Sequence, residues 1–179
     1  MNRNAFLKSA LGMSVGAMPL LSLSRNNGID IKRFIEIWQI SEELTLEFAE
    51  AMPQKEYNFR PAGLEDVYSY GEQMQHIAEN NINLLSRYIT DEAPPDLSYQ
   101  NDLDKESIKN NISTSFRYGT ESMQKLSRYD LFAEVEFGGR NIPRWHVLFI
   151  AQDHTTHHCG QSVVYLNANG YSPPNYRKW

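Results

Sequence analysis

The residues best suited to chemistry are two histidines, His154 and His158, in the last long segment with helical periodicity. An α-helix turns by about 100° per residue, so residues four apart lie on the same side of it. Both histidines fall in the sector that also holds apolar residues such as Val147 and Ala151. Buried imidazoles need polar partners, and a shared divalent metal ion is one such partner. Hydrogen bonds to neighbouring polar side chains are the alternative.

Other familiar chemical motifs are absent from the sequence. There is no H-E-x-x-H, no E-x-x-H on paired helices, no G-x-S-x-G, no P-loop and no Rossmann glycine pattern. The first two absences exclude a zincin protease and a di-iron carboxylate bundle. Cys159 is the single cysteine, which excludes an internal disulfide and a cysteine-rich zinc site. Helical geometry turns its thiol about 140° away from His154, so we expect a packing role.

Length and composition indicate one globular domain. The chain has 179 residues, of which 41% are hydrophobic and 22% are charged, enough for a sizeable core. Its formal net charge is −5. An acidic chain without a basic stripe is a poor partner for nucleic acid, so we expect none.

The N-terminal residues 1–24 have the pattern of an export signal. Arg3 and Lys8 precede an uncharged, mostly apolar run over residues 10–23, and small residues stand before Arg25. The run is too short for a stable transmembrane span. We expect export, to the periplasm of a bacterium, leaving residues 25–179 as the folded domain. An apolar N-terminal helix packed on that domain is the alternative.

Four amphipathic segments should position the histidines. The periodicity predicts helices over about residues 29–51, from Ser69 onward, from about Asp104 onward, and over residues 143–169. Ser69 and Glu72 have the spacing of a capping box, and Gly170 should end the last helix. The predicted fold class is all-α, an antiparallel four-helix bundle.

Two further features concern the connections and the packing. Gly119 in the middle of the third helix indicates a close approach of a neighbouring helix there. The connector over residues 129–141 can hold a short extended piece, but nothing in it suggests a sheet.

Three stretches carry a resemblance to a known family. They are residues 53–61 (PQKEYNFRP), residues 69–78 (SYGEQMQHIA), and residues 154–161 (HTTHHCGQ) followed by residues 169–174 (NGYSPP). Over about residues 29–179 the chain resembles the DinB-like family of metal-binding four-helix bundles. The resemblance implies three metal ligands, which fall on His76, His154 and His158. Where the family usually has arginine, this chain has Cys159.

The role of His76 rests on this resemblance alone. His76 lies about 140° from the centre of the apolar stripe of its own helix, which is typical of a surface histidine. Three neutral imidazoles would bind zinc, nickel or iron and leave a coordination position open. Candidates for supporting polar groups are Gln161, Glu72 and Asn80, and His157 is a candidate outer group; ordinary polar positions are the alternative for each.

The resemblance also implies a class of function. Characterised relatives in the wider family transfer a low-molecular-weight thiol to small electrophiles or catalyse thiol-dependent isomerisation. We therefore expect an exported metal-dependent transferase or hydrolase with a small-molecule substrate. A non-catalytic metal-binding or stress-related binding protein is the main alternative, and a purely structural bundle is another. Bundles of this kind often pair through exposed apolar helix faces, so a homodimer is a further possibility.

Overall fold

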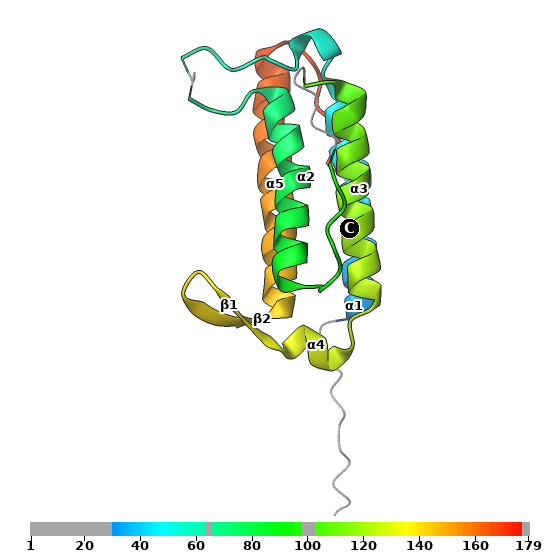
Figure 1. Cartoon of the computed structure of the whole chain (residues 1–179). Helices are drawn as coiled ribbons and strands as arrows, with labels where there is room; N and C mark the ends of the chain where they lie inside the picture. Colours follow the sequence, from blue (N-terminus) through cyan, green and yellow to red (C-terminus); the bar gives the residue numbers. More distant parts are fainter. Residues whose placement is uncertain (1–29, 64–65, 98–102, 177–179) are drawn as a thin grey trace, which may run out of the picture.

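The computed structural model describes residues 30–63, 66–97 and 103–176. The predicted export signal lies outside the described residues and stays a prediction. Four long helices form a bundle (Figure 1), which confirms the predicted fold class; they are α1 (Ile31–Ala51), α2 (Tyr70–Tyr88), α3 (Lys105–Gln124) and α5 (Arg144–Ala168). None of the described helices combines the length and apolar character needed to cross a membrane.

The helices form a ring in which α1 and α2 are diagonal. Each of these two packs against both α3 and α5. The pairs α1–α3 and α2–α5 are antiparallel; for example, Lys105 at the start of α3 pairs with Glu50 at the end of α1. The pairs α2–α3 and α1–α5 are parallel; after α2 the described residues 89–97 run back alongside the bundle (Figure 1). This crossover adds a detail that the simple antiparallel prediction lacked.

Side-chain caps set the helix starts. Helix α1 begins at Ile31 because Asp30 accepts a hydrogen bond from the Lys32 N–H. At the start of α2, Ser69 and Glu72 form the predicted capping box. Helix α5 ends at Ala168, and Gly170 follows with φ of +79°, a left-handed conformation that glycine adopts without strain.

Helices α1 and α3 pack closely around Trp38. The Trp38 ring lies 4.7 Å from the Phe116 ring, tilted by 44°, and the indole N–H donates a hydrogen bond to the Phe116 carbonyl. A Cβ on Gly119 would lie 2.8 Å from the Trp38 Nε1 atom. The predicted close approach at Gly119 is thus confirmed, and only glycine leaves room for the indole.

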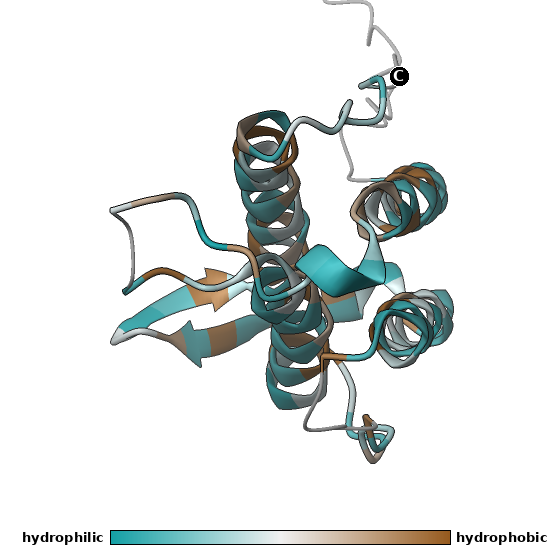
Figure 2. Ribbon diagram, turned by 90° about the horizontal axis from the view of Figure 1, so that it is seen from above, coloured by the Kyte–Doolittle hydropathy of each residue, from teal (hydrophilic) through white to brown (hydrophobic). Residues whose placement is uncertain are grey.

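The connector before α5 corrects one prediction. It contains a short helix and a two-stranded antiparallel sheet, where we expected no sheet; these are α4 (Arg128–Phe132), β1 (Glu134–Phe137) and β2 (Arg140–Pro143). Gly138 and Gly139 form the turn, with φ of +58° and +79°. Two consecutive left-handed residues match the twist of a tight hairpin, and glycine allows them. The hairpin lies at one end of the bundle (Figure 1) and extends sideways beyond the helices when seen along the bundle axis (Figure 2).

The connector between α1 and α2 is mostly irregular in its described residues. It begins with one 3-10 turn, η1 (Gln54–Glu56). Its Tyr57 hydroxyl donates to the Ala49 carbonyl, which holds the connector on the end of α1.

Candidate metal centre

Three histidines from two antiparallel helices converge between α2 and α5. His76 comes from α2, and His154 and His158 come from successive turns of α5. The His154 Nε2 atom lies 3.1 Å from the Nε2 atom of His76 and 3.1 Å from that of His158. One ligand nitrogen from each ring lies within 4.8 Å of the other two. The structure thus brings the three sequence-predicted ligands together.

Polar contacts on both sides fix α2 against this part of α5. The Gln73 amide, one turn before His76, donates to the Ser162 hydroxyl at 2.8 Å and to the His158 carbonyl at 3.2 Å. On the other side the Thr155 hydroxyl lies 3.4 Å from the Asn81 side-chain oxygen. The histidine cluster therefore sits between two inter-helix contacts, which hold the rings in place.

A tyrosine from the preceding connector packs on the cluster. The Tyr68 ring lies 5.0 Å from the His76 ring, and the Tyr68 carbonyl accepts a 2.7 Å hydrogen bond from the Tyr165 hydroxyl on α5. Sequence reasoning missed Tyr68. Its position next to Ser69 was a possible signal, because a residue just before a helix start can fold back on the first turns.

Burial keeps the two α5 histidines neutral. Desolvation lowers the pKa of His154 to about 4, and the neighbouring histidines act in the same direction. Desolvation likewise lowers the pKa of His158 to about 4, and the Gln161 side chain opposes this shift. Both rings are uncharged at neutral pH, and a neutral imidazole is the form that binds a metal.

The ring nitrogens fit a metal ion better than they fit one another. Neutral imidazoles carry one N–H each, so three nitrogens facing one point cannot all be satisfied by mutual hydrogen bonds. Ligand nitrogens in a tetrahedral zinc site lie about 3.3 Å apart, close to the spacing seen here. The Nδ1 atoms of His154 and His158 are buried without a hydrogen-bond partner among the described residues. All-imidazole ligation suits zinc, nickel and iron alike.

The polar candidates around the cluster have different roles. Gln161 interacts with His158, as its effect on the pKa of that ring indicates. Glu72 is committed to the capping box and to a 2.6 Å ion pair with Arg60, so it does not support His76. The structure records no hydrogen bond between Asn80 and the histidines.

Two further histidines are exposed and are not among the three rings whose nitrogens converge. The exposed His157 ring lies edge-on to His158, with ring centroids 5.1 Å apart. His146 is exposed and stacks on Trp145 near the start of α5.

A cavity of about 580 Å³ opens beside His158. Its described lining combines apolar side chains with a few polar ones: Pro61, Asp66, Val67, Tyr68, Gln73, His158, Gln161, Val164 and Tyr165. No lysine or arginine is among them. The nearby Arg60 guanidinium is held by Glu72 and by the Val67 carbonyl. The described side chains of the cavity therefore offer no positive charge to an anionic ligand.

Cys159 faces a different helix. Its buried thiol lies 3.7 Å from the Thr45 hydroxyl on α1, whereas the three histidines lie between α5 and α2. Burial raises the pKa of the thiol to about 11, so it is protonated at neutral pH. The cysteine is thus neither a neighbour of the ligand nitrogens nor an activated nucleophile.

Comparison with known proteins agrees with this architecture. The sequence model of the family described as DinB superfamily matches residues 37–162. A crystal structure of a DinB-like protein from Bacillus cereus ATCC 10987 has a TM-score of 0.71 and 19% identity, and the match covers 82% of this chain and 97% of that one. A DinB-like protein from Bacillus subtilis has a TM-score of 0.65 and 24% identity, with 82% and 98% covered. These two likenesses show the fold. No curated protein matches the chain.

Proposed function

The chain belongs to the DinB superfamily, and we propose that it is a divalent-metal-binding protein that acts as a metal-dependent enzyme on a small molecule. The observation that carries the proposal is the convergence of the His76, His154 and His158 ring nitrogens, two pairs of them 3.1 Å apart. Zinc, nickel and iron are the candidate ions.

Different residues would bind the ion and keep its ligands in place. The three histidines would supply three neutral ligands, which leaves coordination open to water or substrate, as in catalytic rather than structural sites. When bound, a divalent ion lowers the pKa of a water or thiol that it contacts and polarises a carbonyl group. Gln73 and the Thr155–Asn81 contact would keep the rings aligned.

The adjoining cavity supports a small substrate without negative charge. Tyr68, Val67 and Val164 offer apolar and aromatic surface, while Gln161 and Asp66 offer polar groups. Because no lysine or arginine is among the described lining residues, the cavity offers no charged partner to the carboxylates of an anionic thiol cofactor away from the ion. Among the reactions considered, this favours hydrolysis of a neutral small molecule over transfer of an anionic thiol.

Export is a separate part of the proposal. It rests on the pattern of residues 1–24, in which a positively charged start precedes an apolar run. A periplasmic location is consistent with hydrolysis, because low-molecular-weight thiol cofactors are mainly cytoplasmic.

Elemental analysis tests the metal site. Residues 25–179, purified without affinity histidines, should contain about one zinc, nickel or iron ion per chain. The His154→Ala/His158→Ala variant should contain none while keeping its helical circular dichroism. A parent protein that stays metal-free after incubation with each of the three ions would refute the proposal.

Activity assays then separate an enzyme from a binding protein. The metal-loaded chain should hydrolyse neutral esters or amides, or transfer thiols, faster than the double variant. Stoichiometric metal without turnover of either substrate class would establish the non-catalytic metal-binding alternative.

A further inference from the structure

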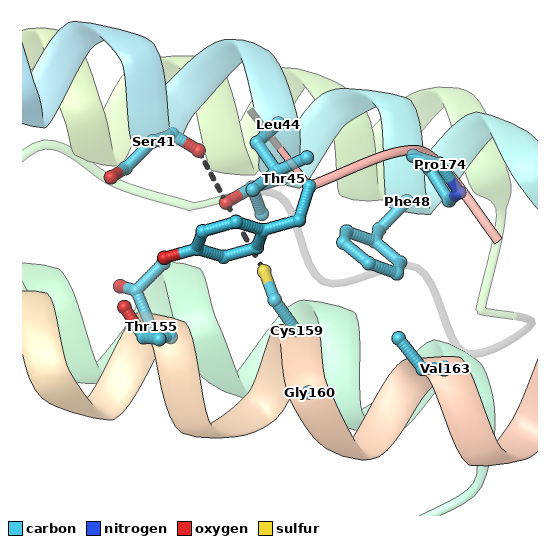
Figure 3. A pocket seen from close by; sticks show the side chains of 11 residues that line it. Ser41, Leu44, Thr45, Phe48, Thr155, Cys159, Gly160, Val163 and Pro174 are labelled. Atoms are coloured by element: carbon cyan, nitrogen blue, oxygen red, sulfur yellow. Dashed lines mark hydrogen bonds between the residues drawn. The ribbon is translucent and has the colours of Figure 1, made fainter. Parts of the chain in front are cut away.

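A second cavity lies on the other side of α5, between that helix and α1. Its volume is about 150 Å³. Figure 3 shows the Cys159 side chain extending from α5 toward Thr45 on α1, with Leu44, Phe48 and Val163 around it. The metal centre lies between α5 and α2, and none of its three histidines lines this cavity.

The lining is apolar and uncharged. It consists of Ser41, Leu44, Thr45, Phe48, Thr155, Thr156, Cys159, Gly160, Val163, Pro174 and Tyr176. The threonine hydroxyls already donate to main-chain carbonyls of their own helices; Thr45 donates to the Ser41 carbonyl at 2.7 Å and Thr155 to that of Ala151 at 3.1 Å. The threonines therefore contribute mainly methyl groups and hydrogen-bond acceptors to the cavity.

The tail after α5 forms the outer wall. The Tyr171 N–H donates to the Leu166 carbonyl at 2.8 Å, and the Asn169 amide contacts the Met52 sulfur at 3.7 Å. These contacts turn the chain back over the space between α1 and α5, which brings Pro174 and Tyr176 to the cavity. The tail thus covers part of the groove between the two helices, with Tyr176 still 64% exposed at its edge.

We propose that this cavity is a second binding site, separate from the metal centre, for a neutral apolar molecule of the size of a single aromatic ring. Apolar protein cavities of about 150 Å³ stay dry and take up benzene-sized ligands. A charged ligand would lose its hydration with no charged lining residue to compensate. Apolar contact with Leu44, Phe48 and Val163 supplies the favourable binding free energy.

Cys159 provides a specific reporter, because it is the single cysteine of the chain. Its side chain lines the cavity and is 6% exposed. An occupant of the cavity must therefore cover the thiol. Alkylation by N-ethylmaleimide, followed by mass spectrometry, should be slow in the parent protein and slower still with ligand bound.

Toluene and benzoate are the matched probes. Alkylation should slow as 1 + [L]/Kd, about tenfold at a toluene concentration nine times Kd. Benzoate has the same ring with a carboxylate and should give no protection. Alkylation that is unchanged up to the solubility limit of toluene, or that benzoate slows equally, would overturn the proposal.

Two substitutions locate the binding. Val163 lines the cavity, and Figure 3 shows its side chain on the side of Phe48. In Val163→Phe the larger side chain should fill the cavity, and the toluene-induced rise in Tm should disappear. Gly160→Ala is the control, because Gly160 is exposed and a Cβ there meets no atom within 4 Å; toluene should raise its Tm as it raises that of the parent. An equal rise in Val163→Phe would place the toluene elsewhere and refute the site.

The site does not depend on the proposed metal function. His154→Ala/His158→Ala leaves every lining residue of the cavity in place, so this variant should show the same toluene protection of Cys159 as the parent. Loss of protection in the double variant would show that the two sites are not separate, and would contradict the inference.

Discussion

At the residue scale, burial and direction distinguish histidines that look alike in the sequence. His154, His157 and His158 stand within five positions of one another. His157 is exposed, whereas the other two are largely covered and turned toward His76. Desolvation then lowers the pKa of both covered rings to about 4, which leaves them neutral. The surroundings of each ring, and not the presence of an imidazole, make it a suitable ligand.

Replacing His76 should remove the metal without unfolding the bundle. His76→Ala deletes one of three ligands, and its ring lies at the edge of the cluster against Tyr68. We expect metal affinity to fall by more than about a hundredfold, beyond the effect of outer-shell changes. Competition with a chelator measures the affinity. His146→Ala is the control, because it removes an exposed histidine that stacks on Trp145. Equal affinity in the two variants would contradict a three-histidine site.

The metal-free protein should become less stable as the pH falls from about 6.5 toward 4. The unfolded chain protonates His154 and His158 near the ordinary histidine pKa of 6.5, whereas the folded pKa values are about 4. Between these values the unfolded state binds more protons, so acid favours unfolding. Urea midpoints at pH 7 and pH 5 measure the effect. His154→Ala/His158→Ala should lose less stability than the parent over this interval. Equal losses in the two proteins would mean that burial does not hold the two rings in the neutral form.

The sequence predicted the site only in part, and the reason is geometric. The i, i+4 pair His154 and His158 follows from the helical repeat alone. The position of His76 in the site does not follow from the helical repeat. The repeat gives the direction of its side chain only relative to the apolar stripe of α2, whereas His154 and His158 lie on α5. Which helix neighbours α2 is a property of the bundle, so the resemblance was needed to assign His76. Tyr68 was missed for the same reason.

At the element scale, two glycines in helices should respond oppositely to the same change. Gly119→Ala puts a Cβ 2.8 Å from the Trp38 Nε1 atom and 2.9 Å from a Leu85 methyl group. We expect about 1–3 kcal/mol of overpacking, which exceeds the helix-propensity gain of about 1 kcal/mol. Gly160→Ala meets no atom within 4 Å, so it should stabilise the protein by about 0.5–1 kcal/mol. Urea unfolding measures both, and stabilisation by Gly119→Ala would contradict the close contact.

Local signals predicted the helices well but missed the hairpin. The capping box at Ser69 and the glycine after α5 act within one turn, so sequence alone could identify them. The hairpin depends on Gly138-Gly139 between two strands of only four residues each. Strands this short give little alternation to detect, and a glycine pair is equally typical of an open loop. The parallel arrangement of α2 and α3 was not predicted, because the length of a connection does not determine the direction of the helix that follows it.

At the scale of the whole molecule, the ring of helices places α5 at two separate sites. It meets α2 through the histidines and meets α1 through Cys159. Gln152 extends the second contact by donating a 2.6 Å hydrogen bond to the Ser41 hydroxyl. Because α1 and α2 are diagonal, α5 separates the metal centre from the second cavity. One helix can therefore serve two sites whose occupants never touch.

A bound metal should stabilise the whole bundle, because its ligands join α2 to α5. An ion that binds only the folded state adds RT ln(1 + [L]/Kd), about 4 kcal/mol at a thousand times Kd. For a chain of this length, that corresponds to a rise in Tm of about 8–16 °C. Thermal unfolding with and without zinc, nickel or iron measures the rise, and a chelator should reverse it. His154→Ala/His158→Ala lacks two of the ligands and should show little rise. A rise of equal size in that variant would mean that the ion stabilises the protein elsewhere, and that the helices are not joined through these rings.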